Sequence, residues 1–211
     1  MLKLLGFLLE GTVVSLEIFV LTLLFALPLA LPVALGRMSR SAWVRGPVHV
    51  YTLVMRGTPL ILQIIFVYFA PYYLLGASYD RFTAVIVAFT INYAAYFAEI
   101  YRGGIQSIAR GQWEAAKVLG FTRADAFFRI VLPQVVKRIL PATANEVITL
   151  VKDTALAQTI GVAELFRVAQ NASARQFSTT PIFVAGAFYF VMNWVVSEVF
   201  LRLERRLAYY A

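Results

Sequence analysis

Two acidic residues stand in an otherwise apolar stretch in the second half of the chain, Glu146 and Asp153. They are seven residues apart, which is two helical turns, so on one continuous helix both carboxylates share a face about 10 Å apart. Carboxylates placed in this way can take up an ammonium group, and the side chains of Asn92 and Thr154 add neutral hydrogen-bonding groups. Lys152 is adjacent to Asp153 but lies on a different azimuth. The alternative interpretation is a Lys152–Asp153 or Arg–Asp ion pair that only holds helices together.

A second pattern lies in the most basic loop of the chain and suits docking rather than ligand binding. Glu114, Ala115 and Ala116 begin a run that reads E-A-A-x-x-x-G, and an I-x-L-P run follows nine residues after Gly120. The first residues are good helix formers, and small alanine side chains let another surface approach closely. Gly120 can turn one helix into the next, and Pro133 fits near the start of a new helix. The pattern predicts a short helix that lies across the membrane surface and docks in a partner's cleft.

Three further acidic residues lie inside apolar segments, where a charge costs about 2.5–3.5 kcal/mol at a helix centre. Glu99 precedes Arg102 by three residues, so an ion pair within one helix is possible, and a role in the substrate path stays open. Glu198 precedes Arg202 by four residues, and we interpret this pair as structural. Glu17 has no such neighbour, and structure and function are equally good explanations for it.

Composition indicates an integral membrane protein. Of 211 residues, 61% are hydrophobic and 14% charged, and the mean hydropathy is +0.75, whereas a soluble domain has about 25% charged residues. The chain has no cysteine and a single histidine, His49, so it offers no disulfide framework and no obvious metal site. The net charge of +8 does not point to nucleic acid, because the basic residues bracket apolar spans. The apolar start continues into a full-length span, and we expect no cleaved signal peptide.

The hydropathy pattern predicts about five membrane-spanning helices, each near the 20 residues that a bilayer requires. Pro28 and Pro32 are expected to kink the first span. The fourth span is irregular, because Pro141 and the polar run 143–146 interrupt it and the sequence at 152–154 predicts a break. After that break we expect a helix to resume at Ala155. The expected spans are 12–36, 59–75 with a start as early as Val48, 82–101, 134–152 with its continuation 155–169, and 182–201.

Basic residues predict the orientation in the membrane. Of 19 Lys and Arg residues, loop 37–56 carries four, loop 102–138 seven and the C-terminal tail three. Alternating spans put these three segments on one side, which must be cytoplasmic. The N-terminus and the loops 76–81 and 170–181 then face outside, and the E-A-A pattern faces the cytoplasm.

Several motifs together resemble one family. R-G-T-P-L at 56–60, the segment 92–105, G-Q-W before the E-A-A run, and L-V-K-D-T-A-L at 150–156, with Ala155 in place of Ser, all match it. Over roughly residues 11–205 the chain resembles the permease subunits of polar amino acid ATP-binding cassette importers of the histidine, glutamine and arginine type. The resemblance implies an all-α type I importer permease fold, with a single transmembrane domain over 1–211 and a cytoplasmic coupling segment at about 106–133. It also implies a bacterial cytoplasmic membrane.

The resemblance further implies a transport subunit rather than an enzyme. The chain lacks a G-x-x-x-x-G-K-[ST] nucleotide loop, so we expect no cofactor here, and ATP and Mg bound by a partner ATPase. The other expected partners are a second permease subunit, either a copy of this chain or a different one, an extracytoplasmic solute-binding protein, membrane lipid and an amino acid substrate, and no nucleic acid. The coupling residues would be Glu114, Ala115, Ala116, Gly120 and Pro133.

The residues themselves suggest where a substrate would pass. The excess of acidic over basic groups inside the spans favours a cationic or zwitterionic amino acid. The candidates are Asn92, Glu99, Glu146, Lys152, Asp153 and Thr154. The alternatives are a permease for another small solute such as cystine, a secondary transporter, for which no internal repeat is evident, and a membrane scaffold without transport, which would not need the coupling pattern.

Overall fold

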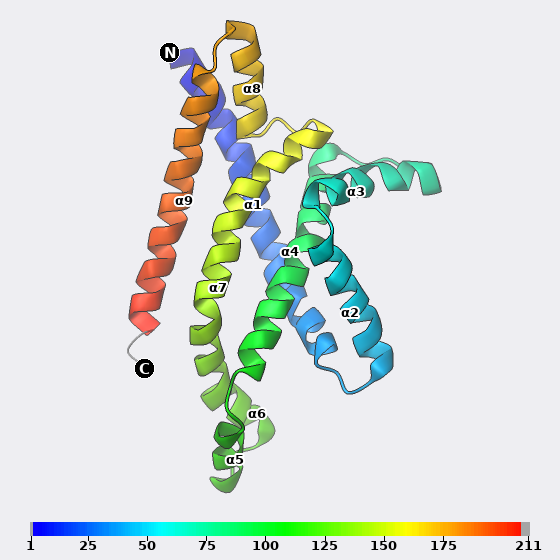
Figure 1. Cartoon of the computed structure of the whole chain (residues 1–211), viewed down its shortest axis with the longest axis vertical. Coiled ribbons are helices and arrows are strands. Elements are labelled where there is room, and N and C mark those ends of the chain that lie inside the picture. The colour runs from blue at the N-terminus through cyan, green and yellow to red at the C-terminus, as the bar shows by residue number, and fades with distance from the viewer. Residues whose placement is uncertain (1, 208–211) are drawn as a thin grey trace.

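The computed structural model describes residues 2–207, and this part of the chain is helical throughout (Figure 1). The predicted all-α class is therefore confirmed. The elements in chain order are α1 Leu2–Arg37, α2 Ala42–Gly57, α3 Leu60–Leu75, α4 Arg81–Gln106, α5 Arg110–Val118, α6 Arg123–Asp125, the π-helical turn η1 Ala126–Val131, α7 Leu132–Asp153, the 3₁₀ helix η2 Thr154–Ile160, α8 Leu165–Gln176 and α9 Thr180–Leu207.

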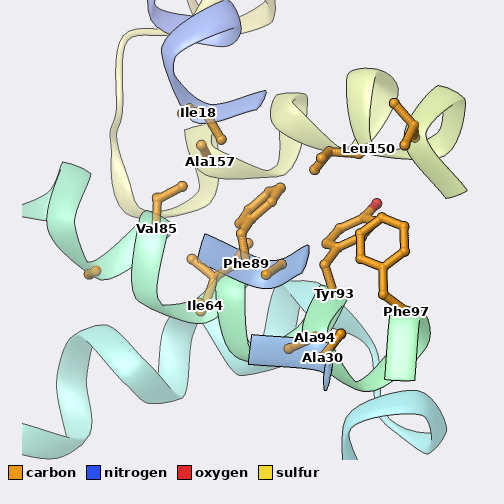
Figure 2. Packing of buried hydrophobic residues seen from close by; sticks show 14 of the residues in the cluster. Ile18, Ala30, Ile64, Val85, Phe89, Tyr93, Ala94, Phe97, Leu150 and Ala157 are labelled. Carbon is orange, nitrogen blue, oxygen red and sulfur yellow. The ribbon is translucent and has the colours of Figure 1, made fainter. Parts of the chain in front are cut away.

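The centre of the molecule is the packing of α1 against α4. A stripe of alanines at four-residue spacing on α1, Ala26, Ala30 and Ala34, is fully buried, as are Ala94 and Ala98 on α4. Inside a bilayer lipid is as apolar as a side chain, so small residues that let helices approach closely supply much of the association. Figure 2 shows larger side chains of the same cluster, with those of α4 pointing toward η2 and α7. These are Phe89, Tyr93 and Phe97, with Leu150 and Ala157 opposite.

Fewer helices meet the length and apolarity of a membrane span than the five predicted. Within residues 2–207, α1, α4 and α9 do so alone, and the pair α2 and α3 does so jointly. The predicted helix over 59–75 is present as α3, although it reaches the length of a span only together with α2. The earlier start near Val48 is wrong as one straight helix, because α2 and α3 are bent by 113° at Thr58 and Pro59. Proline disfavours a helical residue before it, and this explains the break. Helix α7 has 22 residues but is not among these candidates, so its role as a fifth span stays a prediction.

Two other boundaries differ from the sequence prediction. Helix α1 starts at Leu2, well before Thr12, and passes through both of its prolines as a single element. Helix α7 likewise continues through Pro141 and residues 143–146, which were expected to interrupt it. A proline removes one backbone bond, but neighbouring turns can keep a long helix intact.

The predicted break after Lys152 and Asp153 is confirmed, although the chain that follows it differs from the prediction. Helix α7 ends at Asp153, the 3₁₀ helix η2 follows, and Gly161 has φ +85°, which suits glycine. Residues 155–169 are therefore not one helix, since α8 begins only at Leu165. Glu164 accepts hydrogen bonds from the N–H groups of Phe166 and Arg167, both at 2.7 Å, and thereby fixes the start of α8.

The two ends of the long axis differ in content. Helices α5 and α6 lie at one end, and α8 lies at the other with the starts of α1 and α9 (Figure 1). A separate apolar cluster at this second end joins α1, α8 and α9 through Leu8, Leu165 and Ala185. At 36 residues, α1 is about 54 Å long, longer than the roughly 30 Å bilayer core, so it extends beyond the bilayer unless strongly tilted.

Candidate functional site

A cavity of about 390 Å³ lies between α4, α7 and the bend that joins α2 to α3. Three of the predicted substrate-path residues, Asn92, Glu146 and Asp153, line it together. The cavity falls within the size range of small-molecule sites, and both carboxylates are partly buried. The other lining residues are Thr58, Pro59, Leu60, Tyr93, Tyr96, Thr149 and Leu156.

Asp153 has a neutral partner rather than a charged one. The Tyr93 hydroxyl donates a 2.8 Å hydrogen bond to Oδ2 of Asp153. Lys152 is exposed and does not line the cavity, and no ion pair joins it to Asp153 within residues 2–207. The ion-pair interpretation of Lys152 and Asp153 therefore has no support in the geometry. Sequence reasoning missed Tyr93, although the residue is directly adjacent to the candidate Asn92.

The amide of Asn92 donates hydrogen bonds to the α2–α3 bend. Its Nδ2 donates to the carbonyl of Met55 at 3.0 Å and to Oε1 of Gln63 at 2.9 Å. The Gln63 amide in turn donates to the carbonyls of Met55 and Thr58 at 3.0 and 3.1 Å, and to the Thr58 hydroxyl. A helix end leaves carbonyls without backbone partners, and these two buried amides supply donors for them. Gln63 was not among the predicted site residues.

Glu99 lies outside the cavity in a cluster of arginines. Its carboxylate meets Arg37 at 2.8 Å and Arg102 at 2.7 Å, and Arg56 approaches to 4.0 Å. The pair with Arg102 was one of the two interpretations of Glu99, whereas the pairs across to α1 and α2 could not be seen from spacing. The guanidinium of Arg56 also stands 5.4 Å from the centre of the Tyr96 ring, which lines the cavity. Glu198 pairs with Arg202 at 2.8 Å, as expected.

Thr154 has a local structural role. It is 1% exposed, its hydroxyl donates back to the carbonyl of Val151 at 2.8 Å, and it lies outside the cavity of Glu146 and Asp153. Sequence reasoning also missed the buried Glu164, which accepts a 2.9 Å hydrogen bond from the Tyr189 hydroxyl as well as capping α8. Its position one residue before an apolar helix start was the available signal.

The E-A-A pattern forms the short helix that the sequence predicts. Helix α5 ends at Val118, Gly120 has φ +80°, and Pro133 lies in the first turn of α7. Ala116 is buried, whereas Glu114 and Ala115 are exposed. The π-helical turn η1, a geometry often found at functional positions, was not predicted.

The exposed surface of this segment is partly apolar. Val118 is 87% exposed and Leu119 73%, although both are aliphatic. Behind them Trp113 stacks on Phe127 with ring centres 6.4 Å apart, which ties α5 to η1. Glu114 and Lys117 border a cavity of about 330 Å³ beside α6. Residues 114–120, the predicted coupling surface, thus form a helix end that is supported by η1 and has an exposed apolar tip.

The helical fold and its membrane-length helices are those of an integral membrane protein. Residues 26–209 match the family of the binding-protein-dependent transport system inner membrane component. The chain is 38% identical to the arginine transport system permease protein ArtQ of Bacillus subtilis, over 95% of this chain and 92% of that protein. It is also 38% identical to the L-cystine transport system permease protein TcyB of the same organism, over 95% and 86% of the two chains.

Solved structures agree with this result. A crystal structure of an amino acid ABC transporter with histidines matches with a TM-score of 0.90 at 35% identity, over 98% of this chain and 96% of that one. An inward-facing MetNI methionine transporter shares only the fold, with a TM-score of 0.78 at 18% identity. The chain belongs to the binding-protein-dependent inner membrane component family. It is a multi-pass permease subunit of the inner membrane and not itself an ATPase, and a partner ATPase and a binding protein belong to its transport system.

Proposed function

We propose that this permease carries a polar amino acid, cationic or zwitterionic, through the cavity between α4, α7 and the α2–α3 bend. The observation that carries the proposal is the meeting of Glu146 and Asp153 with Asn92 and Tyr93 in one cavity. Ionisable groups at membrane depth are expensive to keep and mark substrate paths in transporters. The relatives named above, which include arginine and L-cystine permeases, support an amino acid as the solute.

The cavity offers groups for both charges of an amino acid. The carboxylates of Asp153 and Glu146 suit the ammonium group, and for a cationic substrate also the side-chain charge. The first turn of α3 starts at Leu60 on the cavity wall. The N–H groups of Leu62 and Gln63 donate to the carbonyl of Pro59, which leaves those of Leu60 and Ile61 for a ligand. A substrate carboxylate at this helix start would also face the positive end of the helix dipole. Lys152, Glu99 and Thr154 do not line the cavity, so we assign them no direct contact with substrate.

The remaining features fit an importer subunit that forms a single domain. We propose that the N-terminus faces outside and the C-terminus inside, on the basis of the basic loops. The coupling surface, with Pro133 at the start of α7, then faces the cytoplasm, where it docks on the partner ATPase. The exposed apolar side chains of α3, such as Leu75 at 80% exposure, are available for lipid or for a second permease subunit, either a copy of this chain or a different one.

Cystine is the second candidate substrate. The relative TcyB, at 38% identity, carries L-cystine in its name, and cystine also presents ammonium groups to acidic residues. Cystine has two carboxylates and two ammonium groups, so its net charge differs from that of a cationic amino acid such as arginine but not from that of a neutral zwitterion.

Uptake by the assembled transporter in proteoliposomes tests the proposal. Arginine, histidine, glutamine, cystine and glutamate would be supplied through the binding protein, and we expect glutamate to be the poorest substrate. Asp153→Asn should reduce apparent affinity about ten- to a hundredfold, the value of a charge-assisted hydrogen bond of about 1.5–3 kcal/mol. Lys152→Met is the control and should transport normally. Full rescue of Asp153→Asn by adding Lys152→Met would show a structural ion pair and reject Asp153 as a ligand.

A further inference from the structure

Phe177, at the end of α8, has a backbone conformation that its side chain disfavours. Its φ and ψ are 48° and 39°, in the left-handed region, and it is the only non-glycine residue with positive φ within residues 2–207. Glycine or asparagine normally takes this position after a helix, because a bulky side chain is strained there. The ring gains no packing in return, since Phe177 is 98% exposed. A strained residue with an unburied ring is the kind of outlier from which a function can be inferred.

Hydroxyl groups around Phe177 hold the turn in this conformation. The hydroxyl of Ser173 donates to the carbonyl of Ser178 at 2.5 Å, and the N–H of Ser178 donates to the carbonyl of Ser173 at 3.2 Å. The Ser178 hydroxyl also accepts from the N–H of Thr180 at 3.2 Å and contacts its hydroxyl at 3.0 Å. The turn is therefore fixed from both sides, and the ring is presented at a defined point.

The surroundings of the ring are polar, unlike those of a lipid-facing residue. Apart from the small Ala174, the other exposed residues of this end of α8 and of the turn are polar: Asn171, Arg175, Gln176, Thr179 and Thr180. On α9, by contrast, exposed apolar side chains such as Phe190 and Trp194 follow one another along the helix. A single exposed aromatic ring inside a polar rim is the arrangement of a protein–protein hot spot.

The position in the molecule indicates the partner. The turn between α8 and α9 lies at the opposite end of the long axis from α5 and α6 (Figure 1). We propose that Phe177 anchors the solute-binding protein on the outer face, with its ring in an apolar pocket whose rim complements Arg175. This inference rests on the topology given under the proposed function, and the family's dependence on a binding protein supplies a partner of this kind.

Titration of ATP hydrolysis with the binding protein, in nanodiscs that contain the whole transporter, tests the assignment. Phe177→Gly removes the ring and fits the left-handed backbone, so it should unfold at the same or a higher temperature. We expect the binding-protein concentration for half-maximal stimulation to rise at least about tenfold. Phe183→Ala is the matched control, because Phe183 is an aromatic residue of α9 that is 76% exposed. This variant should leave the binding-protein concentration for half-maximal stimulation unchanged. An unchanged titration of Phe177→Gly would overturn the assignment, as would a lower unfolding temperature without loss of stimulation.

A fluorescent label separates docking from membrane anchoring. The natural chain has no cysteine, so Phe177→Cys and the control Ser41→Cys, between α1 and α2, can each carry one environment-sensitive dye. Docking predicts that binding protein shifts the Phe177→Cys emission to the blue, and that brominated lipid does not quench it. Quenching by lipid without response to the protein would show a membrane anchor and reject docking. Labelling of Phe177→Cys only from the cytoplasmic side would refute the proposed topology. The proposed substrate cavity is tested separately, by uptake with Asp153→Asn.

Discussion

Nδ2 of Asn92 donates a 2.9 Å hydrogen bond to Oε1 of Gln63, and both side chains also bond to the carbonyl of Met55 at the end of α2. One buried amide pair thus joins α4 to both helices of the 113° bend. The bend brings Thr58, Pro59 and Leu60 to the wall of the cavity. Asn92 therefore acts on the candidate site chiefly through the bend, and its amide hydrogens are already engaged.

Asn92→Leu should destabilise the bend, because it leaves Oε1 of Gln63 without its donor, whereas the Met55 carbonyl keeps the bond from Nε2 of Gln63. The cost of an unsatisfied buried group is about 1–3 kcal/mol, and thermal unfolding of the purified transporter measures it. Asn145→Leu, at an exposed position on α7, is the control and should leave the unfolding temperature unchanged. Equal unfolding of both variants would show that the amide pair does not stabilise the bend.

The cluster around Glu99 predicts a much larger effect than the exposed pair on α9. Glu99→Gln leaves Arg37 and Arg102 without their shared carboxylate, and the Glu99 side chain is only 11% exposed. Allowing for the partial exposure of the arginines, we expect a loss of about 1–3 kcal/mol of stability. Glu198→Gln removes the more exposed pair with Arg202 and should cost at most about 0.5 kcal/mol. Denaturation of the two variants side by side measures both losses of stability. Equal losses would contradict the structural role of Glu99.

The sequence predicted helices and local spacing well, and contacts across the fold poorly. The seven-residue spacing of Glu146 and Asp153 placed both on one cavity wall, because a continuous α7 preserves the periodicity. The turn at Gly120 and the helix start at Pro133 were likewise local. The partner of Asp153 is Tyr93, sixty residues away, and its choice depends on how α4 packs on α7.

The wrong boundaries also have a physical cause. Proline was expected to interrupt α7 at Pro141, but a long helix can lose one backbone bond and continue. Thr58-Pro59 did break its helix, with a bend whose angle depends on the amides of Gln63 and Asn92. Local sequence could therefore indicate a break, whereas its geometry is set by residues in α3 and α4.

Gly104 allows α4 to approach α7 closely. A Cβ atom at Gly104 would stand 2.1 Å from Cγ2 of Ile139, whereas one at the neighbouring Gly103 meets nothing within 4 Å. Gly104→Ala should therefore cost about 1–3 kcal/mol through overpacking, and Gly103→Ala should not destabilise the protein. Adding Ile139→Ala to Gly104→Ala should recover part of the loss in a thermal unfolding assay. If the double variant is no more stable than expected from the two single variants, the two helices do not meet at this point.

The proposed topology can be tested with single cysteines. Ser78→Cys lies in the turn between α3 and α4, next to Asp80, whose carboxylate accepts hydrogen bonds from the hydroxyl and N–H of Thr83. The hydrogen bonds from Thr83 hold the pKa of Asp80 below its usual value. An impermeant thiol reagent added to intact cells should label Ser78→Cys and should leave Ser41→Cys, between α1 and α2, unlabelled. The reverse pattern would invert the assignment of both termini.

The coupling surface predicts that docking of the ATPase can be lost without loss of the fold. Val118 is 87% exposed, so Val118→Glu should leave thermal stability within about 0.5 kcal/mol of wild type. A carboxylate on the apolar tip should nevertheless prevent the ATPase subunit from co-purifying with the permease. Gly120→Pro goes further, because proline cannot adopt the φ of +80° found there, and it should abolish substrate-stimulated ATP hydrolysis. Lys3→Glu, near the opposite end of the molecule, is the control for added negative charge. Normal coupling in both Val118→Glu and Gly120→Pro would exclude residues 114–120 as the docking site.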